Sequence, residues 1–583
     1  MTSRTRPGID RKPNIVLLIT DQQSGNPHWP AGWAEANLPA MSRLRETGLT
    51  FTNGYTNSCT CSPSRTTLFT GLYPAQHGAL EVLECDNSGI PDPAPRAGGP
   101  TVAGAIAGSS LLVKERRQRG LSSQLQNLAK ILHTAGYHVA YKGKWHLTKP
   151  VQYSLSLGQK YWTDADRDHL SQRYGFHDWT MPDAGDNLKI ANMGGGRINN
   201  DGRFVDGSGQ SAKYGYSIPK DVRERESVLH FLKTYDGDAP FCLIVSLVNP
   251  HDVLAYPGTG GALVTLNDGT QIPCYKAAGY HDRDFDSLPI EPPATVDESL
   301  DTKPAAQAQF RVLSNQGNGQ IGEDDYDLQR GYCQFYAYLC QEADKHLGRV
   351  LDALAARPGG MEDTVVFRIA DHGDMAMAHG RQRQKMFNVY QETLNIPFIV
   401  SNPVLFPKPE TTGSFASLID ILPTLATLGG VPDRERWTFK GRDLTPILED
   451  PRASVQDFIH FTYDDLYFYV PSPNHIRCLV EDQWKYAVYY DIYTGRAPEY
   501  EMYHRETDPL ETRNLAHPDA EVPAALQGVI QAERQRLHHR LTQVMEDLGT
   551  TPDTIVWPEV SGGDAFVSTD LPDRKVDPEH FIE

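Results

Sequence analysis

A cysteine, a proline and an arginine lie close together near the N-terminal end of the chain, in the segment Cys61-Ser-Pro-Ser-Arg65. Ser62 can cap a helix, and Pro63 suits the first helical position because its missing N–H would have no partner there. We therefore expect Cys61 just before a helix N-terminus, where backbone N–H groups and the helix dipole favour a bound anion. Arg65, one turn further on, can bind the same anion with two parallel hydrogen bonds. From local physics alone, a buried structural cysteine before an ordinary helix is an equal alternative.

Other chemically active residues directly follow apolar runs of strand length. The runs cover residues 14–20, 137–141, 241–248 and 364–370. The residues that directly follow these runs in the sequence are Asp21-Gln22, Lys142 to His146, Asn249 to Asp252 and Asp371 to Asp374. Near-continuous apolar runs are typical of strands buried on both faces of a parallel sheet, and ligands bind at the carboxyl edge of such sheets. We therefore expect carboxylates, histidines and lysines to meet at one edge, where they can hold a metal ion and an anion.

The segments between these runs predict the elements that position the site. Leu121, Leu125, Leu128, Ile131 and Leu132 form one helical stripe, and residues 332–354 carry a longer one. Strands that alternate with helices indicate an α/β fold with a large, mostly parallel, doubly wound sheet flanked by helices. Beyond residue 450, short runs at 458–463, 475–481, 484–490 and 499–504, followed by a helix near 523–548, predict a smaller α+β domain with an antiparallel sheet. We expect a catalytic domain at 1–450, with insertions at about 150–218 and 253–325, and a C-terminal domain at 451–583 with a helical tail.

Charge and composition exclude several classes of partner. The 583 residues include 55 Lys and Arg against 74 Asp and Glu, a net charge of −19. Such an acidic chain is a poor match for nucleic acid, because phosphate binding needs a basic surface. No apolar run approaches the roughly 20 residues of a membrane helix, and the N-terminus does not resemble a signal peptide. The 8 cysteines are too scattered for a disulfide scaffold, so we expect a cytoplasmic protein without a membrane partner.

The segment Cys61-Ser62-Pro63-Ser64-Arg65 resembles the signature of the type I, formylglycine-dependent sulfatases of the alkaline phosphatase superfamily, near the arylsulfatase and phosphonate monoester hydrolase branch. Thr70-Gly71 matches the usual continuation, and the resemblance extends to the stretch from Tyr503 to Leu515. It implies an alkaline phosphatase-like fold. It also implies that a formylglycine-generating enzyme or an anaerobic maturase oxidises Cys61 to Cα-formylglycine. One hydroxyl of the hydrated aldehyde would attack sulfur, and the other would expel sulfate. Cys59 lacks the proline and arginine at the required offsets.

The same resemblance assigns a metal site. Asp21, Gln22, Asp371 and His372, with the modified Cys61, look like ligands of one divalent ion. Oxygen donors with one imidazole suit Ca²⁺ or Mn²⁺ better than a thiol-rich zinc site would. Many relatives carry a second aspartate where Gln22 stands here, so this site has one negative charge fewer, and direct coordination by Gln22 is less certain than by the others.

Catalytic roles follow from the same comparison. Lys144 and His146, in Gly143-Lys-Trp-His-Leu147, match a family motif. Lys144 would bind a sulfate oxygen and orient the nucleophile, and His146 would act as the general base when sulfate is expelled. His251 would hydrogen-bond the sulfate or the leaving-group oxygen.

One catalytic position has two candidates. In relatives three residues separate a His-Gly pair from a lysine, whereas here four residues separate His379-Gly380 from Lys385. A one-residue insertion before Lys385 is the simplest account, with Arg383 as the alternative contact to the leaving group. We further expect Asp374 to orient His372. His379 and Asn395 are expected to serve packing or turns.

These residues together predict hydrolysis of a sulfate monoester. A phosphonate or phosphate ester hydrolase with the same site is the alternative, and a non-catalytic anion-binding protein on the same scaffold is the third reading. Because the excess acidity must lie outside the positive pocket, we expect small sulfate esters, such as an aryl sulfate, a sulfated sugar or choline sulfate, rather than long polyanions. A homo-oligomer, such as a dimer, is left open.

Overall fold

The computed structural model describes residues 12–83, 119–148, 164–180, 202–209, 219–259, 263–266, 268–465, 470–492, 495–522 and 524–552. It also describes short elements at 153–154, 159–160, 196–198, 212–213 and 216–217. Much of the predicted insertion at 150–218 and the end of the predicted helical tail lie outside these residues. None of the helices within this part of the chain has the length and apolar content needed to cross a membrane.

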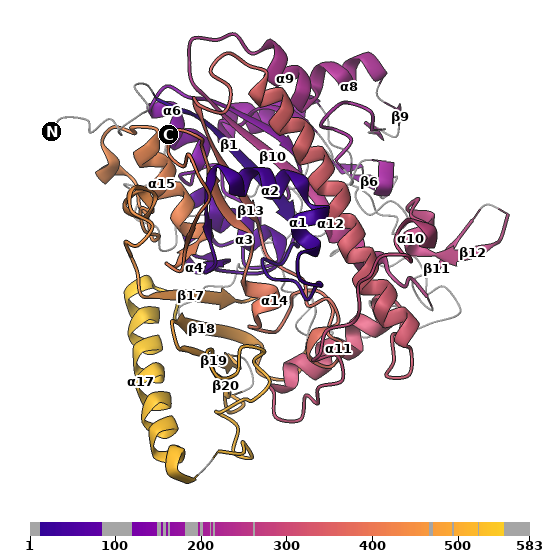
Figure 1. Ribbon diagram of the computed structural model, residues 1–583, viewed down its shortest axis with the longest axis vertical. Coiled ribbons are helices and arrows are strands. Elements are labelled where there is room, and N and C mark those ends of the chain that lie inside the picture. Colours follow the sequence, from indigo (N-terminus) through magenta and orange to yellow (C-terminus); the bar gives the residue numbers. More distant parts are fainter. Residues whose placement is uncertain are drawn as a thin grey trace.

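A large mixed sheet forms the centre of the molecule (Figure 1). In spatial order its strands are β15 (Glu410–Thr412), β2 (Gly48–Phe51), β14 (Phe398–Ser401), β13 (Thr364–Ala370), β1 (Asn14–Asp21), β10 (Phe241–Pro250), β4 (His138–Gly143) and β7 (His177–Thr180). Only β14 runs against its neighbours, and the other described pairings are parallel. The four apolar runs in the sequence are four adjacent strands of this sheet, and the prediction of a mostly parallel α/β fold is confirmed.

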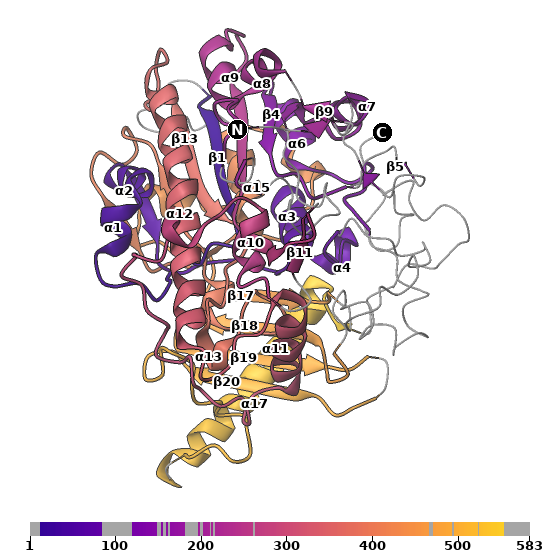
Figure 2. The ribbon, with the colours of Figure 1, turned by 90° about the vertical axis from the view of Figure 1, so that its right-hand side faces the viewer.

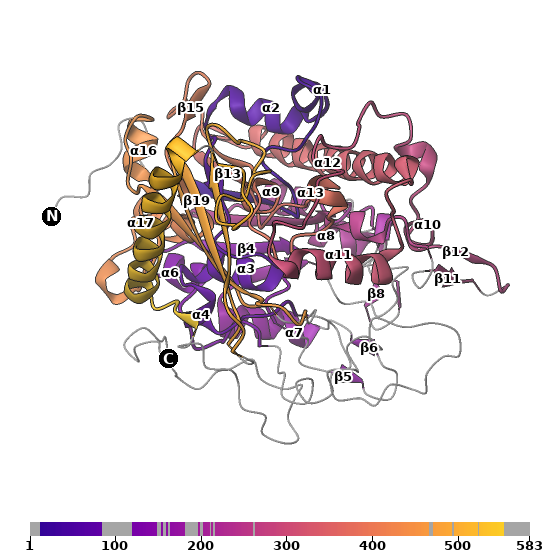
Figure 3. The same ribbon diagram turned by 90° about the horizontal axis from the view of Figure 1, so that it is seen from below.

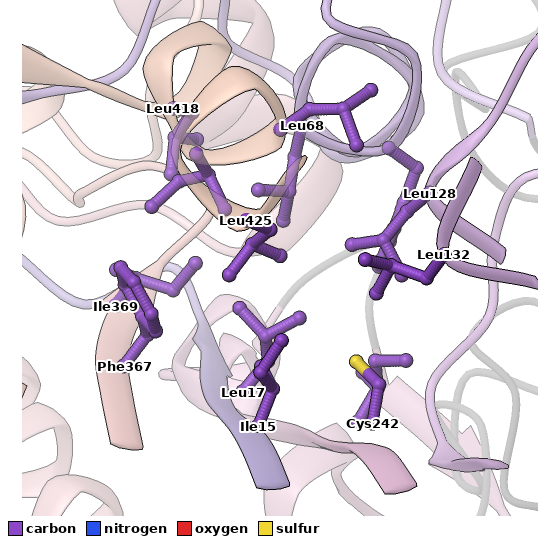
Figure 4. Close-up of a cluster of buried hydrophobic side chains, with 14 of the residues drawn as sticks. Ile15, Leu17, Leu68, Leu128, Leu132, Cys242, Phe367, Ile369, Leu418 and Leu425 are labelled. Carbon is purple, nitrogen blue, oxygen red and sulfur yellow. The ribbon is translucent and has the colours of Figure 1, made fainter. Parts of the chain in front are cut away.

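Side chains of β1 alternate between two apolar layers. Ile15 and Leu17 point to one layer, which contains residues of α3 (Cys61–Thr70), α6 (Leu128–Thr134), α15 (Ile421–Leu428) and α16 (Thr445–Glu449), as Figure 4 shows for part of it. Val16 and Leu18 point to the other, which contains residues of α2 (Pro39–Glu46), α9 (Val228–Thr234) and α12 (Tyr326–Ala355). Figure 2 shows the strands between α12 and α6. Full burial of each such side chain contributes about 1.5–3 kcal/mol, so the strand is held from both faces.

A second, antiparallel sheet lies below the first one in Figure 1. It consists of β17 (Phe458–Tyr463), β18 (His475–Glu481), β19 (Trp484–Tyr490) and β20 (Glu499–His504), all with the bounds expected from the sequence. Leu479 and Val488 on one face pack against α17 (Ala524–Leu548), which lies along the sheet in Figure 3. Phe461, on the other face of this sheet, belongs to a buried apolar cluster that also contains Phe387, which lies between β13 and β14. Because α16 ends at Glu449 and β17 begins at Phe458, we propose that the two domains meet between these residues.

The remaining elements are short or peripheral. The helices are α1 (Trp33–Asn37), α4 (Pro74–His77), α7 (Asp164–His169), α8 (Lys220–Glu226), α10 (Cys274–Ala277), α11 (Ala305–Asn318), α13 (Ala378–Arg381) and α14 (Gln391–Leu394). The two-stranded pairs are β3 (Gly54–Tyr55) with β16 (Ala416–Ser417), β5 (Tyr153–Ser154) with β6 (Gln159–Lys160), β8 (Ala212–Lys213) with β9 (Tyr216–Ser217), and β11 (Leu263–Thr265) with β12 (Gln271–Pro273).

One predicted helix is shorter than its apolar stripe. The stripe begins at Leu121, but α6 begins at Leu128, because the Asn127 side chain accepts a hydrogen bond from the backbone N–H of Lys130 and caps the helix there. Leu121 and Leu125 are still buried in the same core, although they lie in non-helical chain. The stripe therefore identified core residues correctly and the helix start wrongly.

Candidate active site

The carboxyl ends of β1, β4, β10 and β13 deliver polar side chains to one edge of the sheet. Asp21 ends β1, Lys144 follows β4, His251 follows β10 and Asp371 follows β13. These strands are adjacent and parallel, so their ends meet at the same edge. The N-terminal end of α3 lies at this edge too, since Cys61 contacts Asp21 there. The structure thus brings together the side chains expected at a shared site.

The nucleophile candidate occupies the first turn of α3 rather than the position before it. The sequence predicted a helix capped by Ser62, but α3 begins at Cys61, behind Thr60, which has a φ of 27° and no side-chain cap. The Ser62 hydroxyl is used elsewhere, because it accepts a hydrogen bond from the N–H of Leu83 at 3.0 Å. Cys61 is buried, and its Sγ lies 3.6 Å from Asp21 Oδ1 and 3.4 Å from His372 Nε2.

Cys61 belongs to a compact group of metal-ligand types. One ligand atom each from Asp21, Cys61, Asp371 and His372 lies within 4.8 Å of all the others, and all four residues are buried. Two buried carboxylates need compensating positive charge, and two carboxylates with one imidazole are a donor set that suits a divalent cation. The residues present therefore fit a metal ion.

Gln22 makes different contacts from those expected of a ligand. Its backbone N–H donates to Asp371 Oδ1 at 3.0 Å, its Nε2 donates to Asp374 Oδ2 at 2.6 Å, and its Oε1 accepts from Lys385 Nζ at 2.5 Å. The amide thus links Asp374 to Lys385 beside the metal-ligand group. Its coordination of a metal stays a prediction.

Arg65 is held in place before any substrate arrives. Its Nε donates to Asp371 Oδ2 at 2.9 Å, and its Nη1 donates to Ser246 Oγ at 2.8 Å and to the Lys144 carbonyl at 3.0 Å. Lys144 in turn forms a buried ion pair with Asp21. Burial raises the pKa of Asp371, but the charges of His372, Arg65 and Lys144 outweigh burial and bring it down to about 2. This carboxylate is therefore ionised at neutral pH.

His146, the expected general base, and His251, the expected hydrogen-bond partner of the substrate, are both kept neutral. Burial, followed by the Lys144 charge, holds the pKa of His146 well below its usual range. His146 Nε2 lies 2.6 Å from the Leu83 carbonyl, which can only accept, so this nitrogen carries the proton and Nδ1 keeps its lone pair. Burial and the charges of Lys144 and Lys385 lower the pKa of His251 in the same way. A neutral imidazole next to a cationic pocket can take up a proton during the reaction.

The structure separates the two candidates for the leaving-group cation. Lys385 Nζ lies 2.5 Å from Gln22 Oε1, beside the metal-ligand group. The Arg383 guanidinium instead donates to the carbonyls of Tyr256 at 3.3 Å and Gly319 at 2.8 Å. Arg383 therefore ties surrounding loops together, and Lys385 is the cation that faces the site.

One predicted supporting contact is wrong. Asp374 was expected to orient His372, but the His372 ring is held by the Gly373 carbonyl, 3.0 Å from Nδ1. The Asp374 carboxylate accepts instead from the N–H of Ala376 at 2.7 Å, a local turn contact, and from Gln22 and Tyr332.

His379 and Asn395 serve packing, as the sequence suggested. His379 stacks on Tyr390 with ring centroids 3.6 Å apart. Asn395 donates to the carbonyls of Thr52 and Gly54 at 3.1 and 3.0 Å. The sequence analysis missed Ser246, which accepts a hydrogen bond from Arg65. Ser246 carries the only hydroxyl in the apolar run 241–248, and this polar interruption could have identified it.

Comparison with known proteins decides the family. The family model described as Sulfatase matches residues 13–431. The chain belongs to the sulfatase family. The model described as N-sulphoglucosamine sulphohydrolase, C-terminal, matches residues 380–543. Arylsulfatase K of Rattus norvegicus is 23% identical over 528 residues, which cover 90% of this chain and 78% of the relative.

Two solved structures resemble the fold. One, of a protein in complex with its substrate D-glucosamine-2-N,6-O-disulfate, has a TM-score of 0.61 at 17% identity and covers 93% of this chain and 99% of its own. The other, a phosphonate monoester hydrolase from Silicibacter pomeroyi, has a TM-score of 0.56 at 19% identity and covers 91% of this chain and 95% of its own. With the family established, the enzyme is a sulfuric ester hydrolase, as the residues of the signature predicted.

Proposed function

We propose that this enzyme hydrolyses small sulfate monoesters with a formylglycine nucleophile made from Cys61 and one bound divalent metal ion. One observation carries the proposal: Cys61 lies in the first turn of α3, within 4.8 Å of the ligand atoms of Asp21, Asp371 and His372. Nucleophile and metal ligands therefore share a single buried site, as a reaction on a tetrahedral anion requires.

Asp21, Asp371 and His372 would hold the metal ion, Ca²⁺ or Mn²⁺, together with Cys61 and Gln22. When bound, the ion polarises a sulfate oxygen and makes the attacking hydroxyl more acidic. That hydroxyl depends on oxidation of Cys61 to formylglycine by a separate maturation enzyme, which we include in the proposal as a partner.

The chain's own residues bind and orient the substrate. Arg65, Lys144 and Lys385 place three positive charges around the site, against the two negative charges of Asp21 and Asp371. Asp374, which Gln22 links to Lys385, adds a third carboxylate, so positive and negative side chains balance here and a bound divalent ion would make the pocket positive, although the chain carries −19 overall. Preorganised charges of this kind stabilise the negative charge that develops on sulfate oxygens, because they do not have to reorient during the reaction.

His146 would accept a proton, and His251 would form a hydrogen bond to the substrate. His146, which is neutral and has its lone pair on Nδ1, would accept a proton from the nucleophilic residue when sulfate leaves. His251, at the end of β10, would hydrogen-bond the sulfate or the leaving-group oxygen together with Lys385. Both steps need neutral imidazoles at working pH, which the lowered pKa values provide.

The test compares kcat/KM for an aryl sulfate and the matched aryl phosphonate monoester. We expect the sulfate to be preferred, and Cys61→Ala to abolish turnover of both. Cys59→Ala is the matched control: this neighbouring cysteine is also buried, but its Sγ donates to the Lys385 carbonyl, so its loss should leave turnover largely intact.

Other outcomes separate the alternatives. A preference for the phosphonate would overturn the sulfatase assignment and leave the nucleophile in place. Full turnover by Cys61→Ala would reject both enzymatic readings. Peptide mass spectrometry that finds only unmodified Cys61, in protein produced with a maturation enzyme, would favour an anion-binding scaffold.

A further inference from the structure

Two residues of a short connecting segment contact both the nucleophile helix and the candidate base. The N–H of Leu83 donates to Ser62 Oγ at 3.0 Å, next to Cys61. The carbonyl of the same Leu83 lies 2.6 Å from His146 Nε2. The preceding residue, Val82, donates its N–H to Asp465 Oδ2 at 2.9 Å. Val82 and Leu83 therefore connect three parts of the chain that are far apart in sequence.

Asp465 holds the other side of the nucleophile as well. Its Oδ2 also accepts the hydroxyl hydrogen of Thr60 at 2.5 Å, and Thr60 directly precedes Cys61. The Asp465 side chain is buried, so this carboxylate contacts the protein interior rather than solvent. One oxygen atom thus binds to both segments that flank the active centre.

A short bridge between the two domains explains why Asp465 lies at this place. Ser58 and Thr462 form an isolated parallel β-bridge, and the N–H of Thr462 donates to the Asn57 carbonyl at 2.9 Å. The bridge holds the two segments side by side, so Thr60, two residues beyond Ser58, meets Asp465, three residues beyond Thr462. The C-terminal sheet therefore delivers a carboxylate beside the nucleophile.

Asp465 holds Thr60 directly and His146 through Val82 and Leu83, and both Thr60 and His146 have strained backbones. Thr60 has a φ of 27° and His146 a φ of 52°, values that residues with a side chain rarely adopt. Such conformations are unfavourable and persist only where surrounding contacts enforce them. The Thr60 side chain is held by Asp465 directly, and the His146 ring is held by the segment that Asp465 anchors.

We propose that Asp465 is a positioning residue for the reaction, which aligns Cys61 through Thr60 and His146 through Val82 and Leu83. It acts through these residues and does not touch the reacting atoms. The proposal rests on the proposed function, because it assumes that Cys61 and His146 work as nucleophile and base. It also makes the C-terminal sheet a component of the active centre rather than an accessory domain.

The experiment measures kcat and KM separately for Asp465→Ala and Asp465→Asn, per molecule that contains formylglycine. A displaced nucleophile or base slows the chemical step more than substrate binding, so we expect kcat of Asp465→Ala to fall about 100-fold while KM changes less than about threefold. Asparagine retains one acceptor oxygen, and Asp465→Asn should recover about 10-fold of that loss.

Asp344→Ala is the matched control. Asp344 is also a buried carboxylate with two hydrogen bonds, from the N–H groups of Ala40 at 2.8 Å and Met41 at 3.0 Å, but it lies in the layer of α2 and α12 on the other face of the sheet. Its loss should lower the melting temperature and leave kcat unchanged. If Asp465→Ala behaved like this control, with unchanged kcat, Asp465 would be merely structural and the proposal would be overturned.

A second variant decides the matter if Asp465→Ala does not fold. Thr60→Val keeps the branched shape and removes only the hydroxyl that Asp465 binds. It should lower kcat in the same way, and the double variant Thr60→Val with Asp465→Asn should lose less than the sum of the single losses, because both changes act on the same contact between Thr60 and Asp465. Additive losses, or an unchanged kcat in Thr60→Val, would reject the mechanism.

Hydrogen exchange separates failure of this inference from failure of the proposed function. If the wild-type enzyme turned over neither ester, the proposed function would fall. The positioning contact could still be tested by amide exchange at residues 60–62 and at residue 64, which Asp465→Asn should accelerate about 10-fold and Asp344→Asn should not change. Unchanged exchange at these amides would overturn the proposal on its own.

Discussion

Arg65 and Asp371 form a fully buried ion pair in the active site, with Arg65 Nε 2.9 Å from Asp371 Oδ2. Because Asp371 also belongs to the metal-ligand group, the guanidinium and the metal site share a carboxylate. The position of the arginine is therefore tied to the position of the ligands. We therefore predict that the site needs an arginine one turn into α3, and not merely any positive charge.

Arg65→Lys should lower kcat/KM about 100-fold, since a lysine cannot reproduce the planar fork that meets Asp371, Ser246 and the Lys144 carbonyl together. Steady-state kinetics on the preferred ester measure the effect. Arg357→Lys is the control, because Arg357, which follows α12, also donates to a backbone carbonyl, that of Tyr235 at the end of α9, at 2.9 Å. Equal activity of Arg65→Lys and wild type would show that charge alone suffices.

Lys385→Ala should lower kcat about 10- to 100-fold, and Arg383→Ala should mainly lower stability. The reason is geometry: Lys385 Nζ contacts Gln22 beside the metal-ligand group, whereas Arg383 bonds Asn315 of α11 and the carbonyl of Gly319 at the end of that helix. The comparison needs kcat and melting temperature for both variants. A large kcat loss in Arg383→Ala without loss of stability would reverse the assignment.

The central strands and much of the site could be predicted from the sequence, for a physical reason. A strand buried on both faces must be apolar along its length, so residues 364–370 read as a strand without any tertiary information, and β13 has these bounds. Polar residues that directly follow such strands must then lie at the same edge of the sheet. Asp21, Lys144 and Asp371 were located by that argument alone.

Contacts between distant segments could not be predicted in this way. The Asp465–Thr60 contact depends on the register between Ser58 and Thr462, which lie far apart in sequence, and periodicity carries no information about such pairing. The wrong expectation for Asp374 has a local cause, since a hydrogen bond to the N–H of Ala376 competes with the partner expected from spacing.

Asp21→Asn should weaken metal binding and lower the melting temperature of the metal-loaded enzyme. A buried carboxylate that offers an anionic oxygen to the site becomes a neutral amide, and binding of a ligand to the native state stabilises it in proportion to affinity. Metal analysis after dialysis, and melting curves with and without a chelator, measure both effects. The chelator should lower the melting temperature of the wild type more than that of Asp21→Asn.

The control for that prediction is Asp420→Asn, a buried carboxylate that bonds Ser417 and the N–H of Arg442 away from the metal-ligand group. This variant should lose stability but keep the full response to the chelator. If wild type and Asp21→Asn responded equally to the chelator, Asp21 would not be a ligand.

His379 should make the folded state less stable in alkaline solution. Its Nδ1 lies 2.6 Å from Glu298 Oε2 and its Nε2 lies 3.5 Å from Glu392 Oε2. Burial lowers the pKa of His379, but Glu392 and Glu298 outweigh burial and raise it to about 9. Lys303 pairs with the same Glu298, His28 Nε2 lies 2.5 Å from Glu392 Oε1, and Glu511 is a further buried carboxylate near His379.

The direction of the pH effect on stability follows from the raised pKa of His379. A folded-state pKa above the unfolded one means that the native state binds the proton more tightly, so the contribution is complete below about pH 6.5 and is lost as pH rises through about 9. Between about pH 7 and 9.5 the loss amounts to about 2 kcal/mol, at 1.36 kcal/mol for each pKa unit. Urea unfolding of wild type and His379→Gln at both pH values isolates this group from others that titrate. The difference in stability between the two proteins should shrink toward alkaline pH, and a difference that stays constant would mean that His379 is neutral in the folded enzyme.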